Sequence, residues 1–433
     1  MRLDFHFGTT VRPLIDKAFP ASPAGEPHEY SLPAMEIIMK LKSAALAAAL
    51  LSPALAILAV LPGTVAAQTQ GVTKDEVVIG TIQDLSGPIA AFGKSARNGM
   101  QLRADEANEQ GGINGRKVKF IAEDSGYDPK KAVLAAQKLA QRDKIFVTAG
   151  NIGTPIAMAT MPIFFEKNIP HLFPLTAARQ MYDPLHKLKY SFAATYFDQV
   201  RSAVKNLTKI KADRKWCTIY QDDDFGLEVL QGAEAAMKEN GKTLIEKTSY
   251  KRGSTDFSSQ VARMKSAGCD TVIMGTIIRE TVGTIGEARK TGFNAEFVGT
   301  SAAYTHLIPR LGGPAMNGFI AAHTIAHPYL DDAAQNVRHW ATKYKTKFNE
   351  DPDVFSAYGY LIMDNTLTTV AKAGKNLTTE AFIMALDSST FPPDMFGGDG
   401  MNFTPTKHLG SSKSRLSQIK DGRWTVIGGY VDP

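Results

Sequence analysis

The sequence has few cysteines and no long run of like charges. Two cysteines in 433 residues exclude a cysteine-rich zinc module and an iron–sulfur protein. The net charge is +6, but the basic residues are scattered, so nothing indicates nucleic-acid binding. A hydrophobic share of 44% with 21% charged residues is typical of a globular protein. The length predicts two or three domains rather than one core.

Motifs for catalysis and cofactor binding are also missing. The sequence contains no Gly-x-Ser-x-Gly elbow, no Cys-x-x-Cys pair and no zinc-type histidine pair with a neighbouring glutamate. Segment 87–95 is similar to a phosphate-binding loop, but five residues separate its glycines where four are needed. The acidic run 222–224 lacks the alternating spacing of a calcium loop. We therefore expect no enzyme, no metal and no cofactor, and we interpret both segments as loops.

One apolar run, residues 43–61, carries no charge. Two lysines lie just before it, and small residues at 65–67 follow it, which is the order of a secretory signal. We predict a signal peptide over 39–67, cleaved after Ala67. A transmembrane helix is the alternative, and Pro53 argues against it. Residues 1–38 contain acidic residues and prolines, so we interpret them as a start codon assigned too early or as a disordered extension.

After residue 68, short apolar runs alternate with longer amphipathic stretches. The predicted strands are 77–82, 118–122, 145–149, 169–173, 217–220, 243–248, 271–274, 296–298, 416–419 and 424–428. The predicted helices are 95–108, 129–141, 155–167, 225–239, 256–267 and 280–290, with a largely helical segment at 333–386. Two series of this kind predict an α/β protein with two lobes, each built on a parallel sheet.

Ligands of open α/β sheets bind outside the carboxyl ends of the strands. The loops to expect there are 83–92, 150–154 and 174–177 in the first lobe, and 221–225, 275–279 and 299–304 in the second.

Both cysteines, Cys217 and Cys269, lie at the start of predicted strands in the second lobe. The first and third strands of a doubly wound sheet are neighbours, and an exported protein meets oxidising conditions. A disulfide between them is one hypothesis, and two free buried thiols are the other.

Several motifs together resemble one family. They are Asp84-Leu85-Ser86-Gly87-Pro88, the glycine-rich turn at 111–116, Asp124 with Asp128-Pro129, Phe173-Pro174, Asp198-Gln199, Asp256-Phe257 and Gly292. In this combination they look like the branched-chain amino acid-type solute-binding proteins of ABC transporters, and the resemblance runs from about residue 72 to the C-terminus.

The resemblance implies a type I periplasmic binding protein fold, in which two Rossmann-like lobes are joined by three crossovers and close on a ligand by hinge motion. The first lobe would comprise 72–195 plus 324–400, and the second 196–323 plus 401–433. The protein would be a periplasmic monomer that hands a small-molecule ligand to permease subunits at the inner membrane.

The resemblance also assigns a ligand site. Thr154, preceded by Gly153, falls where the family has a serine that holds the ligand carboxylate, and we expect the amides of Leu175 and Ala177 to contribute. The family's threonine hydroxyl is lost at Ala177 or displaced to Thr176.

In the second lobe, Phe225 and Ile277 replace tyrosines, and Ser301 replaces the acidic residue that holds the ligand ammonium. Glu280 is the nearest acidic alternative, but we expect it to point into the following helix. An ammonium in a closed cleft needs a counter-charge.

The sequence therefore favours an aromatic or other hydrophobic carboxylate. The alternatives are a branched-chain or other amino acid, or an amide- or urea-type ligand bound by a sensor of the same fold. Phe92, Tyr196 and Tyr358 are further candidates for lining the cleft, the two tyrosines with core packing as the alternative. Arg279 is a candidate polar contact, with a solvated helix start as its alternative.

Overall fold

The computed structural model describes residues 69–433, so the predicted signal peptide at 39–67 and the extension at 1–38 lie outside the described residues. Within residues 69–433, no helix has both the length and the apolar character needed to cross a membrane.

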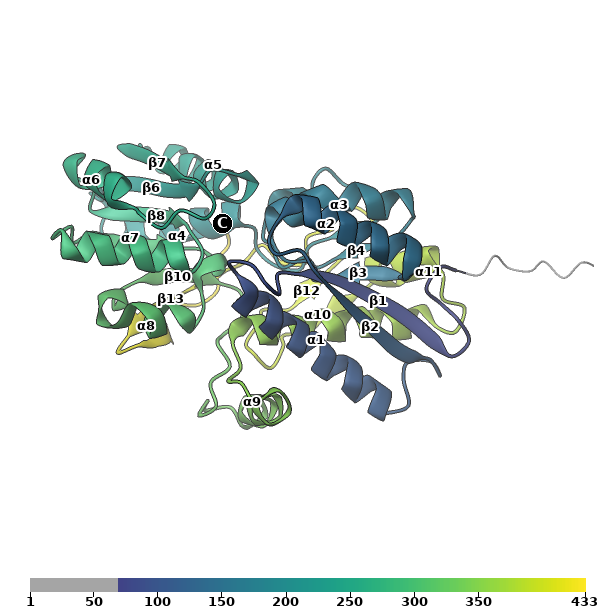
Figure 1. The fold of residues 1–433 in the computed structure, drawn as a ribbon. Coiled ribbons are helices and arrows are strands. Elements are labelled where there is room, and N and C mark those ends of the chain that lie inside the picture. The colour runs from purple at the N-terminus through teal and green to yellow at the C-terminus, as the bar shows by residue number, and fades with distance from the viewer. Residues whose placement is uncertain (1–68) are drawn as a thin grey trace, which may run out of the picture. The chain divides into compact units, whose positions relative to one another are not determined.

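The first lobe is built on a five-stranded sheet. Its strands are β1 (Glu76–Gln83), β2 (Lys117–Asp124), β3 (Val147–Ala149), β4 (His171–Leu172) and β5 (Lys189–Tyr190). They are all parallel and follow the order β2-β1-β3-β4-β5 (Figure 1). Every residue of β1 after the first is buried, as expected for a parallel strand that is covered on both faces.

Six helices accompany this sheet: α1 (Ala90–Glu109), α2 (Pro129–Gln137), α3 (Thr154–Glu166), α9 (Gln335–Phe348), α10 (Val354–Ala373) and α11 (Thr379–Asp387). The Asp128 side chain caps α2 by accepting the amide hydrogen of Lys130 at 2.7 Å, as its position before Pro129 predicts. Helices α1 and α10 pack side by side (Figure 1). Gly99 and Gly359 permit this, because a Cβ on either would lie about 2 Å from a carbonyl oxygen of the other helix.

The second lobe contains a larger sheet. Its strands are β6 (Trp216–Gln221), β7 (Glu246–Tyr250), β8 (Thr271–Gly275), β9 (Glu296–Gly299), β10 (Ile320–His323), β13 (Arg415–Lys420) and β14 (Arg423–Val426). Their order is β14-β13-β10-β9-β8-β6-β7, parallel from β7 to β10 and antiparallel at the β13 and β14 edge. The helices are α4 (Tyr196–Ile210), α5 (Asp224–Glu239), α6 (Ser258–Ser266), α7 (Arg279–Lys290) and α8 (Leu307–Gly312).

A disulfide joins Cys217 to Cys269, whose Cα atoms are 5.9 Å apart. Cys217 lies in β6, and Cys269 lies two residues before the neighbouring strand β8. Of the two hypotheses for these cysteines, the structure has the bonded one, and it places the bond in the second lobe.

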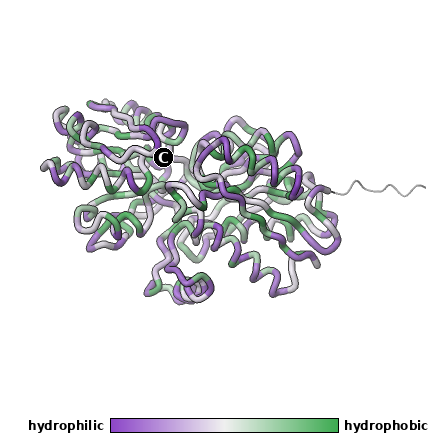
Figure 2. Tube along the Cα trace, in the orientation of Figure 1, coloured by the Kyte–Doolittle hydropathy of each residue, from purple (hydrophilic) through white to green (hydrophobic). Residues whose placement is uncertain are grey.

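Hydrophobic residues follow the interior strands of both lobes, and hydrophilic residues gather at the periphery (Figure 2).

The chain passes between the two sheets three times: after β5, after β10, and again before β13. The sequence assigns residues 401–433 to the second lobe, but the first part of this segment contacts the first lobe. The short strand β12 (Met401–Asn402) pairs with β11 (Thr390–Phe391), and the His408 ring stacks on Tyr190 of β5 at 3.8 Å. The second-lobe sheet resumes only at β13, so the predicted boundary at 400/401 is too early.

The alternation of strands and helices in the sequence locates most of these elements to within a few residues. It misses β5, β10, β11, β12, α4 and α8. The α4 signal is present, since Thr195 caps the helix by accepting the Asp198 amide hydrogen, and Val200, Val204 and Leu207 recur at helical spacing. Strand β5 has two residues, too few for a periodic pattern.

Candidate functional site

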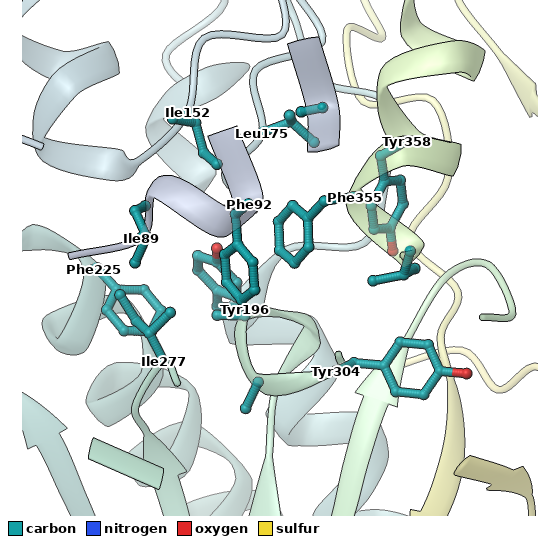
Figure 3. Packing of buried hydrophobic residues seen from close by; sticks show 14 of the residues in the cluster. Ile89, Phe92, Ile152, Leu175, Tyr196, Phe225, Ile277, Tyr304, Phe355 and Tyr358 are labelled. Atoms are coloured by element: carbon teal, nitrogen blue, oxygen red, sulfur yellow. The ribbon is translucent and has the colours of Figure 1, made fainter. Parts of the chain in front are cut away.

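Residues of both lobes enclose a small cavity of about 30 Å³, which we call the central recess. It lies beyond the carboxyl ends of the parallel strands, where α/β sheets bind ligands. Its lining residues are Ile89, Phe92, Tyr127, Ile152, Gly153, Thr154, Leu175, Tyr196, Phe225, Ile277, Ala302 and Phe355. Seven of the residues that the sequence predicts for the site are among them, and Figure 3 shows the apolar members of the group.

A second cavity of about 40 Å³ adjoins the first, and we call it the inner recess. The two share Leu175, Tyr196, Ala302 and Phe355. Four further predicted residues line the inner recess: Thr176, Ala177, Ser301 and Tyr358. The structure therefore brings together all the predicted lining residues except Arg279.

The first lobe presents the start of helix α3 to the central recess. Gly153 precedes the helix with φ of 96°, and no side chain caps the helix end within the described chain. The first amide groups of a helix lack partners inside the helix and carry partial positive charge, which favours an anion. The Thr154 hydroxyl lies 2.6 Å from the Thr176 hydroxyl, so two hydroxyl groups stand together at this helix end.

The backbone of Leu175 is already engaged. The Leu175 amide donates to the Asn151 carbonyl oxygen at 2.9 Å, and the Leu175 carbonyl oxygen accepts from the Gly153 amide at 3.2 Å. These bonds fix the loop beside β3, so in this arrangement Leu175 presents its side chain to the recess and not a free amide. The Thr176 hydroxyl lies beside the Thr154 hydroxyl, at the position to which the family's threonine hydroxyl would be displaced.

Aromatic rings fill the centre of the site. The Phe92 and Phe355 rings stack with their centroids 3.8 Å apart, and Tyr196 meets Phe225 edge to face at 5.0 Å. In Figure 3 these four rings lie between Ile152 and Leu175 on one side and Ile277 on the other. The recesses are far smaller than the several hundred Å³ usual for ligand sites, because these rings occupy the space.

The second lobe offers no acid at the position where the family holds an ammonium. The Ser301 amide donates to the Gln199 side-chain oxygen at 2.8 Å, and the Gln199 amide group donates back to the Ser301 hydroxyl at 3.0 Å. Gln199 is buried, so this pair fixes the loop after β9 against α4. The Ser301 hydroxyl therefore already has a hydrogen-bond donor.

Glu280 does not behave as the sequence predicts. Its side chain is 6% exposed and lines a third small recess together with Tyr127 and Ile277, both of which also line the central recess. Burial raises the pKa of the Glu280 carboxyl, and the Arg279 charge opposes that shift only in part. An acidic group is thus present near the site, although not at residue 301.

Arg279 is exposed and lines the same third recess as Glu280. A second cation beside that recess is Arg252, which the sequence gives no reason to select. Its guanidinium donates to the Asp223 carboxylate at 2.8 Å and to the Tyr127 carbonyl oxygen at 3.3 Å, so it joins the two lobes.

The two predicted tyrosines are buried and their burial raises the pKa of each phenol, so both stay protonated. The Tyr358 hydroxyl lies 2.9 Å from the Thr324 hydroxyl, as expected for core packing with a satisfied polar end. Tyr127, Gln199 and Phe355 are lining residues that sequence reasoning missed. Phe355 is the second residue of helix α10, from a distant part of the chain, so no local motif reveals it.

The comparisons with known proteins agree with this architecture. A family model described as "Periplasmic binding protein" matches residues 76–423. The chain belongs to this family. Within it, the chain is of the type I, branched-chain amino acid kind.

Relatives of this periplasmic binding protein are distant in sequence. A leucine-, isoleucine-, valine-, threonine- and alanine-binding protein of Pseudomonas aeruginosa is 22% identical over 359 residues, covering 83% of this chain and 91% of the relative. A leucine-specific-binding protein of Salmonella typhimurium is 23% identical over 300 residues, covering 69% of this chain and 80% of the relative.

Solved structures show the same fold. A branched-chain amino acid ABC transporter protein of Thermus thermophilus with bound valine gives a TM-score of 0.76 at 18% identity, covering 84% of this chain and 98% of that one. A fatty acid ABC transporter substrate-binding protein of Thermomonospora curvata also gives 0.76, at 23% identity, with 84% and 95% covered.

Proposed function

We propose that this protein is the exported solute-binding component of an ABC importer, and that it captures a small carboxylate with an apolar body. The ligand is released unchanged to permease subunits at the inner membrane. One observation carries the ligand class. The two recesses together have two hydroxyls at an uncapped helix end on the first-lobe side. On the second-lobe side they have Phe225, Ile277 and a serine at 301.

The first-lobe side of the recess suits a carboxylate. The Thr154 and Thr176 hydroxyls can both turn toward an anion, and the start of α3 adds backbone amides and a favourable dipole. Hydrogen bonds to a charged group are the stronger ones, at about 1.5–3 kcal/mol each. This side anchors the ligand.

The second-lobe side suits an apolar body. A ligand ammonium buried against Phe225 and Ile277 would lose its hydration, and the uncharged Ser301 hydroxyl supplies no negative charge to compensate for that loss. A ring or an alkyl chain meets no such penalty there. One solved structure of this fold contains bound valine, and another is named as a fatty acid ABC transporter substrate-binding protein. The fold therefore accommodates both kinds of acid.

Binding requires the lining side chains to rearrange. A ligand larger than a few atoms does not fit 30–40 Å³, and the rings at the centre of the site, among them the stacked Phe92 and Phe355 of the first lobe, occupy the space that it needs. The ligand then shifts the population toward the lobe arrangement that binds it more tightly.

The test is a thermal-shift and calorimetry screen on refolded protein, with matched acids that differ only in the α-ammonium. The pairs are phenylpropanoate against phenylalanine and 4-methylpentanoate against leucine, with 4-hydroxybenzoate, coumarate and octanoate added. A ligand at 100 times its Kd stabilises by about 2.7 kcal/mol. The proposal expects the deaminated member of each pair to bind more tightly, and recovery of the ligand unaltered after denaturation.

Amino acid binding is the second candidate, and the Glu280 carboxyl is the observation that favours it. A buried carboxyl beside the recess would gain from an ammonium partner. If leucine or phenylalanine binds more tightly than its deaminated partner, and Glu280→Gln abolishes that preference while Glu287→Gln on the same helix does not, this candidate holds.

A further inference from the structure

Two histidines and an aspartate meet outside the ligand recesses, at a point where the lobes are joined. His306 precedes α8 of the second lobe, His327 lies in the crossover between β10 and α9, and Asp353 caps α10 of the first lobe. Within residues 69–433 this is the one group of three side chains placed to hold a metal ion, with all donor atoms within 4.8 Å of one another.

The distances match a metal site. The Asp353 carboxylate oxygen lies 3.3 Å from Nδ1 of His306 and 3.5 Å from Nε2 of His327. Zinc bonds to histidine nitrogen and carboxylate oxygen are about 2.0–2.2 Å long, so the donor atoms of a tetrahedral site are separated by about 3.3–3.5 Å. Two of the three separations already have this length, and the third is no longer than 4.8 Å.

One ring nitrogen of this group has no partner. Among the described residues, Nδ1 of His327 has no hydrogen-bond partner, while Nδ1 of His306 and Nε2 of His327 both face the single Asp353 carboxylate oxygen, at 3.3 and 3.5 Å. His327 is 5% exposed, so water does not readily compensate for the missing partner. A bound cation would accept the imidazole lone pairs that are directed toward this oxygen.

The aspartate is held in place as metal ligands usually are. Its second oxygen accepts the Thr305 hydroxyl hydrogen at 2.9 Å, and the first accepts the Val354 amide hydrogen at 2.7 Å. Asp353 is 2% exposed, so its charge is buried and its orientation fixed. Outer partners of this kind orient metal-binding carboxylates and tune their affinity.

We propose that His306, His327 and Asp353 form a binding site for a divalent transition metal of the zinc class, with water as the fourth ligand. Two imidazoles and one carboxylate are the donors that zinc accepts, and together they carry one negative charge to offset the ion. The three ligands come from the second lobe, a crossover and the first lobe. A bound ion would therefore hold the two lobes at one hinge angle. The site is separate from the ligand recess, so it is independent of which solute the protein carries.

The experiment titrates the purified, untagged full chain, stripped with chelator, with Zn²⁺ by calorimetry. A parallel titration with Co²⁺ reads the visible absorption of a low-symmetry cobalt site. Expected is one equivalent per chain, with affinity at least about 100-fold weaker in His306→Ala and His327→Ala. His339→Ala, which changes an exposed histidine on α9, should bind as the wild type does.

Two results would overturn the proposal. If Zn²⁺ binds no more tightly than to the chain carrying both His306→Ala and His327→Ala, or if Co²⁺ gives only the weak spectrum of the hydrated ion, there is no site. Circular dichroism of each variant separates loss of metal ligands from loss of fold. His327→Gln provides a less disruptive second variant if the alanine form is unstable.

Discussion

The first lobe brings the Thr154 and Thr176 hydroxyls and a helix end to the two recesses, whereas the second brings Phe225 and Ile277. The polar groups are fixed by backbone bonds beside β3 and β4, and the apolar ones follow β6 and β8. Under the proposed function, the first lobe would hold the acid group of the solute. Its body would lie between apolar side chains of both lobes, because Phe92, Leu175 and Phe355 of the first lobe line the recess as well.

The lobes also differ in covalent constraint, and removing it gives the largest expected effect. The disulfide closes a loop across 52 residues of the second lobe, and the chain-entropy relation assigns such a loop about 4 kcal/mol. Replacing Cys217 and Cys269 together by alanine should lower the free energy of unfolding by about that amount. Hydrogen exchange should show the loss in β6 and β8, with the strands of the first lobe unchanged. Equal loss in both lobes would mean that they unfold as one unit.

The anchoring side is tested next by Thr154→Val, which removes one hydroxyl and keeps the shape. The affinity for the ligand identified in the screen should fall about 10- to 100-fold, because a hydrogen bond to a charged group is lost. Calorimetry measures this. Thr160→Val in the same helix is the control, since that hydroxyl donates to the Ile156 carbonyl oxygen inside α3. An unchanged affinity in Thr154→Val would place the carboxylate elsewhere.

The second-lobe side is tested by Ser301→Asp, with Ser301→Asn as the uncharged control. The new carboxylate can still accept the Gln199 amide hydrogen, so the loop should stay in place. We expect leucine to gain about tenfold relative to 4-methylpentanoate, which corresponds to about 1.4 kcal/mol. Competition binding measures the ratio, and a ratio that is the same in both variants would show that residue 301 does not face the ligand.

The smallest effect is expected from Glu280→Gln on stability. Burial raises the folded-state pKa of this carboxyl above its ordinary value of 4.5, so ionising it costs the folded protein more than the unfolded chain. The glutamate form is therefore not penalised below pH 4.5 and loses stability as the pH rises through the raised pKa. Without ligand, Glu280→Gln should raise the Tm on the order of 1 °C at pH 8 and leave it unchanged at pH 4. Thermal melts at both pH values check this, and a gain at pH 4 would contradict the burial argument.

Sequence reasoning reaches the two sheets and most of the recess for a physical reason. Strand and helix periods are local, and ligand loops follow the carboxyl ends of parallel strands, so the pattern predicts the loops that line the recess. The resemblance to the family then selects Thr154, Leu175, Phe225 and Ile277 within those loops. The engaged amide of Leu175 is not found, because its partner Asn151 is revealed only by the loop conformation.

Groups assembled from distant segments escape the sequence for a different reason. Phe355 stacks on a ring more than 250 residues earlier, and Asp353 meets histidines from two other segments. Each of these residues is unremarkable in its own neighbourhood. The packing of α10 against α1, with Gly99 and Gly359 at the contact, brings Phe355 to the recess and Asp353 to the hinge.

Under the proposed function, the stacked Phe92 and Phe355 rings compete with the solute for the same space. A solute would then bind only where its contacts outweigh the ring contact that it displaces, which disfavours a small polar molecule. The pair would thereby set a lower limit on solute size. Replacing Phe92 or Phe355 by leucine should lower the limit on solute size and widen the range of acids that bind.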